Sequence, residues 1–284
     1  FLGSLALICK LDATTLSLTD RNGVSVADAI RIFGLNPADL PSAILPDETF
    51  AYIEFHIEQG PLLESENSSL GIVETLVGQT RMNLTFDGQP NHAGTTPMHL
   101  RHDAMAAAAQ WIVAVEDYAK EHADMVATVG RVETSPGVGN VVAGRVTASL
   151  DIRHANDQTR NLAVTTLIGS AMSASAKRGV KVTTRTLLEQ PAVPMNPGLT
   201  ALLQSAATKA KFPNRRMVSG AGHDAMIVAQ RLPCAMLFLR SPGGLSHHPD
   251  EAVLTQDVEA ALTTAMEFLT LLRDDKATPK GDHA

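Results

Sequence analysis

The order of six segments between residues 78 and 192 constrains the fold of this chain more than any other feature of its sequence. A strand pattern at 80–88 is followed by a long helical pattern at 102–121, for which Asp103 is a suitable N-cap. Two strand patterns, a second long helical pattern and a last strand pattern follow, at 125–133, 145–154, 157–179 and 180–187. This order is that of the ferredoxin-like split unit, in which two helices cover one face of an antiparallel sheet.

The residues on either side of this unit have a different organisation. Strand patterns occur at 50–59 and 234–239, and helical patterns at 196–211, 223–232 and 255–275. Strands mixed with helices indicate an α/β layer. We therefore expect residues 1–77 and 193–284 to form one discontinuous α/β domain. The ferredoxin-like (βαββαβ) domain, residues 78–192, would be inserted into it.

Composition excludes several classes of protein. The 284 residues are 44% hydrophobic and 19% charged, an ordinary balance for a globular chain, and their net charge is −7. A negative chain is a poor general ligand for nucleic acid, and no apolar run is long enough to predict a membrane span. Two cysteines, Cys9 and Cys234, are too few for a disulfide framework, so a reducing, cytoplasmic setting is expected.

The strand at 50–59 has one apolar face and one face of ionisable residues. The ionisable face includes Glu54, His56 and Glu58. Burying such a face costs free energy unless something pairs its charges, and a divalent metal would do so. The alternative is a solvated strand face on which His56 has no special role.

A polar loop, residues 242–251, follows the apolar strand at 234–239. Its ionisable residues are His247, His248, Asp250 and Glu251. Loops at a sheet edge are where α/β proteins place their active sites, and imidazole with carboxylate suits zinc or manganese. Adjacent histidines cannot easily bind the same ion, so at most one is expected to do so. The alternative is a polar turn that caps the last helix.

Two further residues could act on a substrate. His92 lies in a loop of small residues, 91–98, and could donate a hydrogen bond to a developing oxyanion, although a histidine without a role is the alternative. Arg153 on the strand at 145–154 could bind a carboxylate through two hydrogen bonds. A surface ion pair with Asp151 would explain it as well.

Other motifs are weaker. His223 and Asp224 stand at the start of a helical pattern, where helix capping would explain Asp224. The sequence contains no phosphate-binding loop, dinucleotide fingerprint or nucleophile elbow. Hydrolysis by a serine nucleophile therefore has no motif to support it.

Five stretches, taken together, resemble one enzyme family. They are HIEQGPLLE, GQPNHAGTTPMHLRHDA, NVVAGRVTASLDIRH, SGAGHDAM and PGGLSHHPDE. In this order they resemble the allantoate amidohydrolases and N-carbamoyl-L-amino-acid hydrolases, dinuclear-metal enzymes related to dimeric metal exopeptidases. The opening FLGSLAL is also similar to the family's Phe-x-Gly-Ser-Arg-Ala, with Leu5 in place of Arg. The resemblance extends from residue 1 to about residue 272.

The resemblance implies two divalent metal ions, zinc or manganese. It makes the discontinuous α/β domain, residues 1–77 and 193–284, the metal-binding catalytic domain. It makes His56 a ligand of one ion and His247, from the Gly-Leu-Ser-His segment, a ligand of the other. His248 then occupies a position that does not bind metal.

The resemblance also implies how the substrate is bound. Gln79, Asn140 and Arg153 match the family's substrate-binding Gln, Asn and Arg. His92 matches a lid histidine that enters the active site of the partner subunit and polarises the scissile carbonyl. A homodimer formed through the lid domain, residues 78–192, is therefore expected.

Two family motifs are missing from the sequence. The family has a His-x-Asp, whose Asp bridges the metals, and a Glu-Glu-Gly that supplies a ligand and the general base. Both precede the Phe-x-Gly-Ser stretch. This sequence has no Glu-Glu pair, and its His-x-Asp at 248–250 lies in the C-terminal loop. We therefore expect a family member without its N-terminal part, inactive alone.

The expected function is metal-dependent hydrolysis of a linear ureido (carbamoyl) C–N bond in a small ureido carboxylate. Allantoate is the preferred substrate, and N-carbamoyl-L-amino acids or N-carbamoyl-β-alanine (β-ureidopropionase activity) are alternatives. A different possibility is an inactive fragment that serves only as a dimerising scaffold. Nucleic acid and membranes are not expected as partners.

Overall fold

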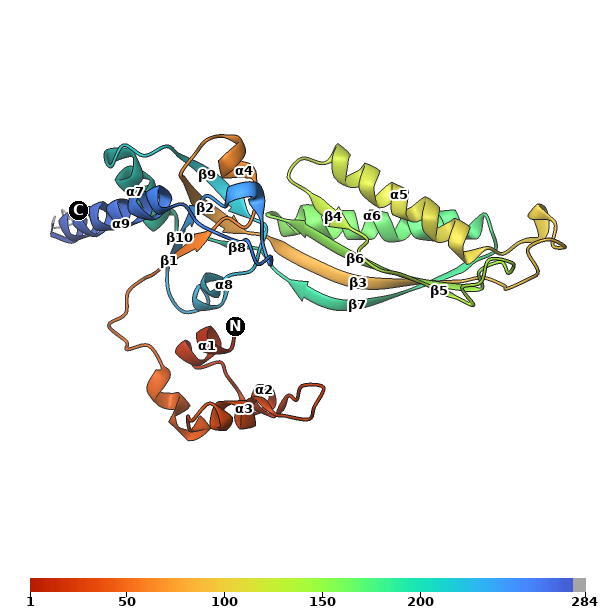
Figure 1. The fold of residues 1–284 in the computed structure, drawn as a ribbon, viewed down its shortest axis with the longest axis horizontal. Helices are drawn as coiled ribbons and strands as arrows, with labels where there is room; N and C mark the ends of the chain where they lie inside the picture. Colours follow the sequence, from red (N-terminus) through yellow and green to blue (C-terminus); the bar gives the residue numbers. More distant parts are fainter. Residues whose placement is uncertain (278–284) are drawn as a thin grey trace, which may run out of the picture. The chain divides into compact units, whose positions relative to one another are not determined.

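The computed structural model describes residues 1–277, which form two compact units. The first unit combines residues 1–76 with residues 194–277, and the second comprises residues 77–193. Each unit contains its own five-stranded sheet (Figure 1). The expected mixed α/β class is therefore confirmed.

The sheet of the first unit mixes parallel and antiparallel strands. Its strands are β1 (Tyr52–Ile57), β2 (Leu70–Leu76), β8 (Val193–Pro194), β9 (Asn214–Ser219) and β10 (Cys234–Leu239). The order is β1-β10-β2-β8, and β9 also pairs with β2. Because β1 and β10 are parallel, with His56 opposite Phe238, the segments that follow them leave from the same edge of the sheet.

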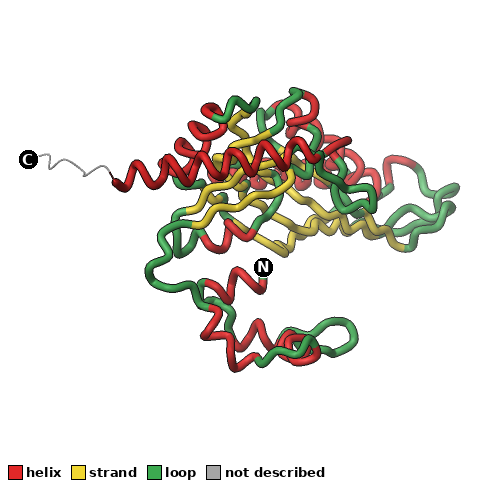
Figure 2. Tube along the Cα trace, turned by 60° about the vertical axis from the view of Figure 1, so that its left-hand side comes forward, coloured by secondary structure: helices red, strands yellow, loops and turns green. Residues whose placement is uncertain are grey.

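Two helices pack on this sheet, α7 (Pro197–Lys209) and α9 (Thr255–Ala277). All six residues of β10 are buried, which explains why this strand is uniformly apolar. Figure 2 shows α9 as the long helix that ends the described part of the chain. Among the residues that the structure describes, none of the helices combines the length and apolar character needed to cross a lipid bilayer.

Short helices complete the first unit. They are α1 (Leu2–Leu7), α2 (Ala13–Ser17), α3 (Val26–Ile32), α4 (Leu62–Ser65) and α8 (Asp224–Val228), with 3₁₀ turns at Pro37–Ala43 and Pro242–Gly244. Ser4 of α1 donates a hydrogen bond to Asp224 of α8 (Oγ to Oδ1, 2.6 Å), which joins the start of the chain to the region of β1.

The second unit is an antiparallel sheet with two long helices on one face (Figure 1). Along the chain its elements are β3 (Gly78–Asp87), α5 (Ala104–Glu121), β4 (Val126–Thr128), β5 (Val132–Ser135), β6 (Arg145–His154), α6 (Asp157–Ala176) and β7 (Lys181–Gln190), with a 3₁₀ turn at Met98–Leu100. β3 lies between β7 and β6, and both β4 and β5 pair with β6. Asp103 accepts hydrogen bonds from the amides of Met105 and Ala106, which confirms it as the N-cap of α5.

The core of the second unit explains its sequence pattern. The alternate residues Met82, Leu84 and Phe86 of β3 are buried against α5 and α6, where Trp111 is fully buried. Their neighbours in β3 project from the opposite face of the sheet. That opposite face carries the polar residues considered below.

The structure differs from the sequence-based expectations in two places. The strand expected at 125–133 is interrupted, since the structure forms β4 and β5 with a break at 129–131 that includes Gly130. Strands β2 and β9 were not expected. β2 begins with four buried residues in a row and therefore lacks alternation, while β9 begins Asn-Arg-Arg, which is untypical of a strand.

Candidate active site

The side chain of His56 is held by the backbone of its own strand. Its side chain is half-buried near the end of β1, and its Nδ1 lies 2.8 Å from the carbonyl oxygen of Ile57. A carbonyl can only accept, so Nδ1 carries the proton and Nε2 keeps its lone pair. A hydrogen bond to a backbone carbonyl holds many metal-binding histidines in the tautomer that binds metal.

His223 lies directly beside His56. Their ring centroids are 4.6 Å apart in an edge-on arrangement, and His223 is only 3% exposed. Its Nε2 lies 2.9 Å from the hydroxyl of Ser219. Burial, assisted by the neighbouring His56, lowers the pKa of His223 to about 4, so its imidazole is neutral at pH 7. The sequence offered only a His-Asp pair after small residues as a signal for this residue.

The carboxylates near His56 have structural partners. Oε2 of Glu54 accepts a hydrogen bond from the amide of Ala225 (2.7 Å), so a strand residue binds the first turn of α8. Burial raises the pKa of Glu54. Asp224 accepts the hydroxyl of Ser4 instead. Capping as the explanation of Asp224 is therefore wrong, because the N-cap position belongs to His223.

The segment after β1 contacts the loop after β10. Glu58 accepts hydrogen bonds from the amides of Leu62 and Leu63 and so stabilises the start of α4. Glu64 in α4 accepts the amide of Gly243 (2.9 Å). Gly244, at φ +63°, approaches Pro61 so closely that a Cβ there would lie 2.9 Å from the proline Cβ. The two motifs singled out as possible metal-binding stretches therefore pack against each other.

His247 is exposed in the loop after β10 and has a φ of +56°. Its amide donates to Glu251 (2.9 Å), and the amide of Asp250 donates to Nδ1 of His248 (3.2 Å), so the loop's own side chains shape its backbone. Within the part of the chain that the structure describes, no group of three or more His, Cys, Asp and Glu side chains is placed to hold a metal. The assignments of His56 and His247 to two ions stay predictions.

A buried ion pair closes the base of this loop. Arg240 precedes the loop and Asp257 lies in the first turn of α9. Nε and Nη2 of the arginine each lie 2.9 Å from one carboxylate oxygen, and Asp257 is fully buried. Two charge-assisted hydrogen bonds therefore join the two ends of the loop that carries His247.

The polar face of the second unit brings Gln79 and Arg153 together. They are opposite each other in the register of β3 and β6, as are Arg81 and Asp151. Asp151 accepts hydrogen bonds from all three side chains at 2.7–3.0 Å. Burial opposes ionisation of Asp151, but the bonds from Arg153, Gln79 and Arg81 prevail and lower its pKa to about 2. The Asp151–Arg153 pair considered from the sequence is thus present.

His92 and Asn140 belong to adjoining loops. Val141 forms an isolated bridge with His92, and the amide of Ala93 donates to the carbonyl of Asn140 (2.9 Å). The exposed ring of His92 accepts backbone amides of Gly94 and Thr95 at Nδ1 (3.0 and 3.2 Å). Nδ1 therefore carries no proton, and Nε2–H is left as a hydrogen-bond donor.

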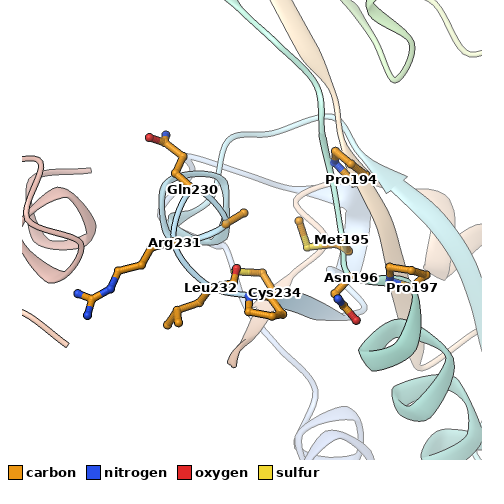
Figure 3. Close-up of a pocket in the computed structure, with 10 residues that line it drawn as sticks. Pro194, Met195, Asn196, Pro197, Gln230, Arg231, Leu232 and Cys234 are labelled. Carbon is orange, nitrogen blue, oxygen red and sulfur yellow. The ribbon is translucent and has the colours of Figure 1, made fainter. Parts of the chain in front are cut away.

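The first unit contains a cavity of about 390 Å³ (Figure 3). It lies at the start of β10, whereas the loop that carries His247 follows the end of this strand. It is lined by residues 194–197, before and at the start of α7, and by residues 229–234, which run from α8 into β10. None of the predicted site residues contributes to it.

Comparisons with known proteins identify relatives over most of the chain. It is 36% identical to an allantoate deiminase of Arabidopsis thaliana over 95% of this chain and 57% of the relative. It is 38% identical to an N-carbamoyl-L-amino-acid amidohydrolase of Paenarthrobacter aurescens, over 90% of this chain and 63% of the relative. An allantoate amidohydrolase of Escherichia coli is 36% identical over 87% and 60%. The chain thus spans less than two thirds of the length of these relatives.

A solved structure and a family description agree with these relatives. A hydantoinase/carbamoylase-family amidase from Burkholderia multivorans superposes with a TM-score of 0.86 at 29% identity, covering 95% of this chain and 66% of that one. Residues 29–272 match the family described as Peptidase family M20/M25/M40. The match covers well over half of the sequence, and the chain therefore belongs to the M20/M25/M40 peptidase family.

Proposed function

We propose that this protein hydrolyses a linear ureido C–N bond in a metal-dependent reaction, with allantoate as its substrate. The observation that carries the proposal is the imidazole of His56, whose Nδ1–H is bound by a backbone carbonyl so that Nε2 can bind an ion. The relatives named allantoate deiminase, allantoate amidohydrolase and N-carbamoyl-L-amino-acid amidohydrolase support the substrate class.

Two divalent ions, zinc or manganese, are part of this proposal. His56 would bind one ion and His247 the other. When bound, such ions polarise a carbonyl and make water a nucleophile near neutral pH. Further ligands would be needed, because the described residues supply no group of three.

The remaining residues would bind and polarise the substrate. Arg153 would pair with its carboxylate, while Gln79 and Asn140 would hydrogen-bond its ureido groups. His92 would donate Nε2–H to the developing oxyanion, which the tautomer imposed by two backbone amides supports. In this proposal His92 acts in the active site of the partner subunit. The ferredoxin-like lid domain, residues 78–192, would form the dimer.

A substrate panel separates the candidate reactions. We expect the protein encoded by the complete reading frame to release ammonia from allantoate with a higher kcat/KM than it shows for N-carbamoyl-L-amino acids or N-carbamoyl-β-alanine. A preference for either carbamoyl compound would replace allantoate as the substrate but keep the reaction class. Hydrolysis of dipeptides alone would contradict the proposed function.

A scaffold without activity is the second candidate for the 284-residue chain alone. Its support is that the residues described by the structure include no group of three possible metal ligands. Metal binding measured on this chain by equilibrium dialysis would distinguish the two. Fewer than two tightly bound ions per chain is the expected result. Two tightly bound ions would show that this chain binds both ions by itself and would contradict the scaffold.

A cytoplasmic location is also part of the proposal. Cys9 and Cys234 are both free thiols, and Cys9 is exposed, which suits a reducing compartment. Fractionation of cells that produce the protein would test it. Recovery outside the cytoplasm would contradict it.

A further inference from the structure

One carboxylate organises the polar face of the second unit. Asp151 accepts Nε2 of Gln79 at both oxygens (2.9 and 2.7 Å), Nε of Arg81 at one (3.0 Å), and Nε and Nη2 of Arg153 (3.0 and 2.9 Å). Its side chain is 26% exposed and that of Arg153 30% exposed. Three side chains from two strands thus share one acceptor.

The strands place these groups with little freedom. Gln79 and Arg81 are alternate residues of β3, and Asp151 and Arg153 are alternate residues of the antiparallel neighbour β6, so all four share one face of the sheet. Intervening residues such as Ile152 are buried on the other face. The backbone is therefore held by the core, and only the side-chain orientations remain to be fixed.

The charge of Asp151 decides the orientation of the Gln79 amide. An ionised carboxylate can only accept hydrogen bonds, so it must meet the NH₂ group of Gln79 and not the amide oxygen. The amide oxygen, Oε1, is then directed away from Asp151. Gln79 is thereby set to accept a hydrogen bond from a ligand.

Asp151 also selects how Arg153 can be used. It accepts hydrogen bonds from Nε and Nη2 of the guanidinium and so fixes the plane of this group. Arg81 shares the charge of Asp151, and the group of two arginines and one aspartate keeps a net positive charge. An anion is still favoured beside it.

From these contacts we infer that Asp151 is a positioning residue for substrate recognition. It leaves the amide oxygen of Gln79 to accept a hydrogen bond from a ureido N–H, and it orients the guanidinium of Arg153 to bind a carboxylate. This face would therefore recognise two groups of a ureido acid, its N–H and its carboxylate. The inference rests on the proposed function and names a specificity residue for it. A compound with an ester oxygen in place of the ureido N–H would place this acceptor opposite the amide oxygen of Gln79, which is also an acceptor. It would therefore bind poorly.

Asp151→Asn tests the inference in the protein encoded by the complete reading frame. Its side chain has nearly the same shape but brings its own NH₂, so the Gln79 amide can reverse and Arg153 loses its ionic partner. We expect KM for the ureido substrate to rise about tenfold or more, with kcat changed by less than about threefold. Asp151→Glu, which keeps the charge but moves it by one methylene group, should raise KM less.

Asp87→Asn is the matched control. Asp87 is another carboxylate of the β3–β6 pair, bonded to Arg145 at the opposite end of these strands (2.6 Å). Its replacement should leave KM unchanged. In the Gln79→Ala/Arg153→Ala background, Asp151→Asn should have no further effect, because Asp151 acts through those two residues. An equal further rise in KM there would contradict the positioning role.

Failure of the inference is distinguishable from failure of the proposed function. A wild-type protein that hydrolyses ureido acids, with an Asp151→Asn variant of unchanged KM, would overturn only the inference. If the wild-type protein hydrolyses no ureido acid, crystal structures decide. The inference predicts that Gln79 and Arg153 change orientation in Asp151→Asn, and unchanged side chains would refute it.

Discussion

Two histidines are fixed in opposite tautomers by the groups that their Nδ1 atoms meet. His56 donates from Nδ1 to a carbonyl and keeps an electron pair on Nε2, whereas His92 accepts two amides at Nδ1 and keeps a proton on Nε2. One imidazole is therefore suited to bind a metal and the other to donate a hydrogen bond. Their backbone neighbours, and not their positions in a motif, determine this division.

Arg153→Lys should raise KM sharply. A lysine ammonium is a point charge, so it cannot pair with Asp151 and a substrate carboxylate through fixed edges as a guanidinium does. We expect a rise of about tenfold or more in steady-state kinetics. Arg131→Lys, in an exposed pair with Glu133, is the control and should not change KM. An unchanged KM for Arg153→Lys would exclude it as the carboxylate-binding residue.

The ionisation of Asp151 should also make the free energy of unfolding depend on pH. Its pKa is lowered from 3.8 to about 2 in the folded chain, so the carboxylate stabilises the fold above about pH 4 and this contribution is lost as the pH falls towards 2. Compared with Asp151→Asn, the wild-type chain should be more stable by about 1–2 kcal/mol at pH 6. Urea unfolding at pH 6 and pH 3 should show this difference shrinking; a difference independent of pH would contradict it.

At the scale of elements, local sequence patterns predicted most of the helices and the strands that have one solvent-exposed face. The sequence predicted β3 and β6 from their alternation, α5 from its N-cap and helical spacing, and β10 from its run of apolar residues. Each of these patterns is regular along its element. β2, buried at four successive residues, and the charged β9 were missed, since neither alternates.

The candidate site was predicted only in part, for a related reason. His56, His247, His92, Asn140, Gln79 and Arg153 could be named from motifs. The contact of His56 with His223, 167 residues away in the chain, and the binding of Arg81 to Asp151 depend on strand register and helix placement. Such pairings are properties of the assembled sheet and leave no local periodicity in the sequence.

The Arg240–Asp257 pair should be important for the loop that carries His247. Asp257→Asn leaves a buried guanidinium without its counter-charge, which should lower the free energy of unfolding by about 3 kcal/mol. Asp28→Asn removes an exposed pair with Arg31 and should leave the free energy of unfolding nearly unchanged. Denaturant unfolding of both variants and of the wild-type protein measures these two changes in the free energy of unfolding. Equal, small effects would show that the buried pair does not close the loop.

At the scale of the molecule, the residues of the proposed site are divided between two units. The first unit carries His56 and His247, and the second carries Gln79, His92, Asn140 and Arg153. Neither unit holds both the proposed metal ligands and the proposed substrate-binding residues.

Mixed variants test whether His92 acts between subunits. His56→Ala and His92→Ala should each be inactive, but a dimer with one copy of each contains one site with both histidines intact. After subunit exchange of an equal mixture, about a quarter of wild-type activity should return. The variants kept unmixed are the controls. No recovery in a mixture shown to exchange subunits would place His92 in its own subunit's site or outside catalysis.

Ammonia release from allantoate before and after metal removal tests the central claim most directly. The protein encoded by the complete reading frame should lose activity on dialysis against a chelator and regain it with manganese or zinc. His56→Ala should regain little at the same metal concentration. Activity that survives complete metal removal, or a His56→Ala variant as active as wild type, would contradict the account.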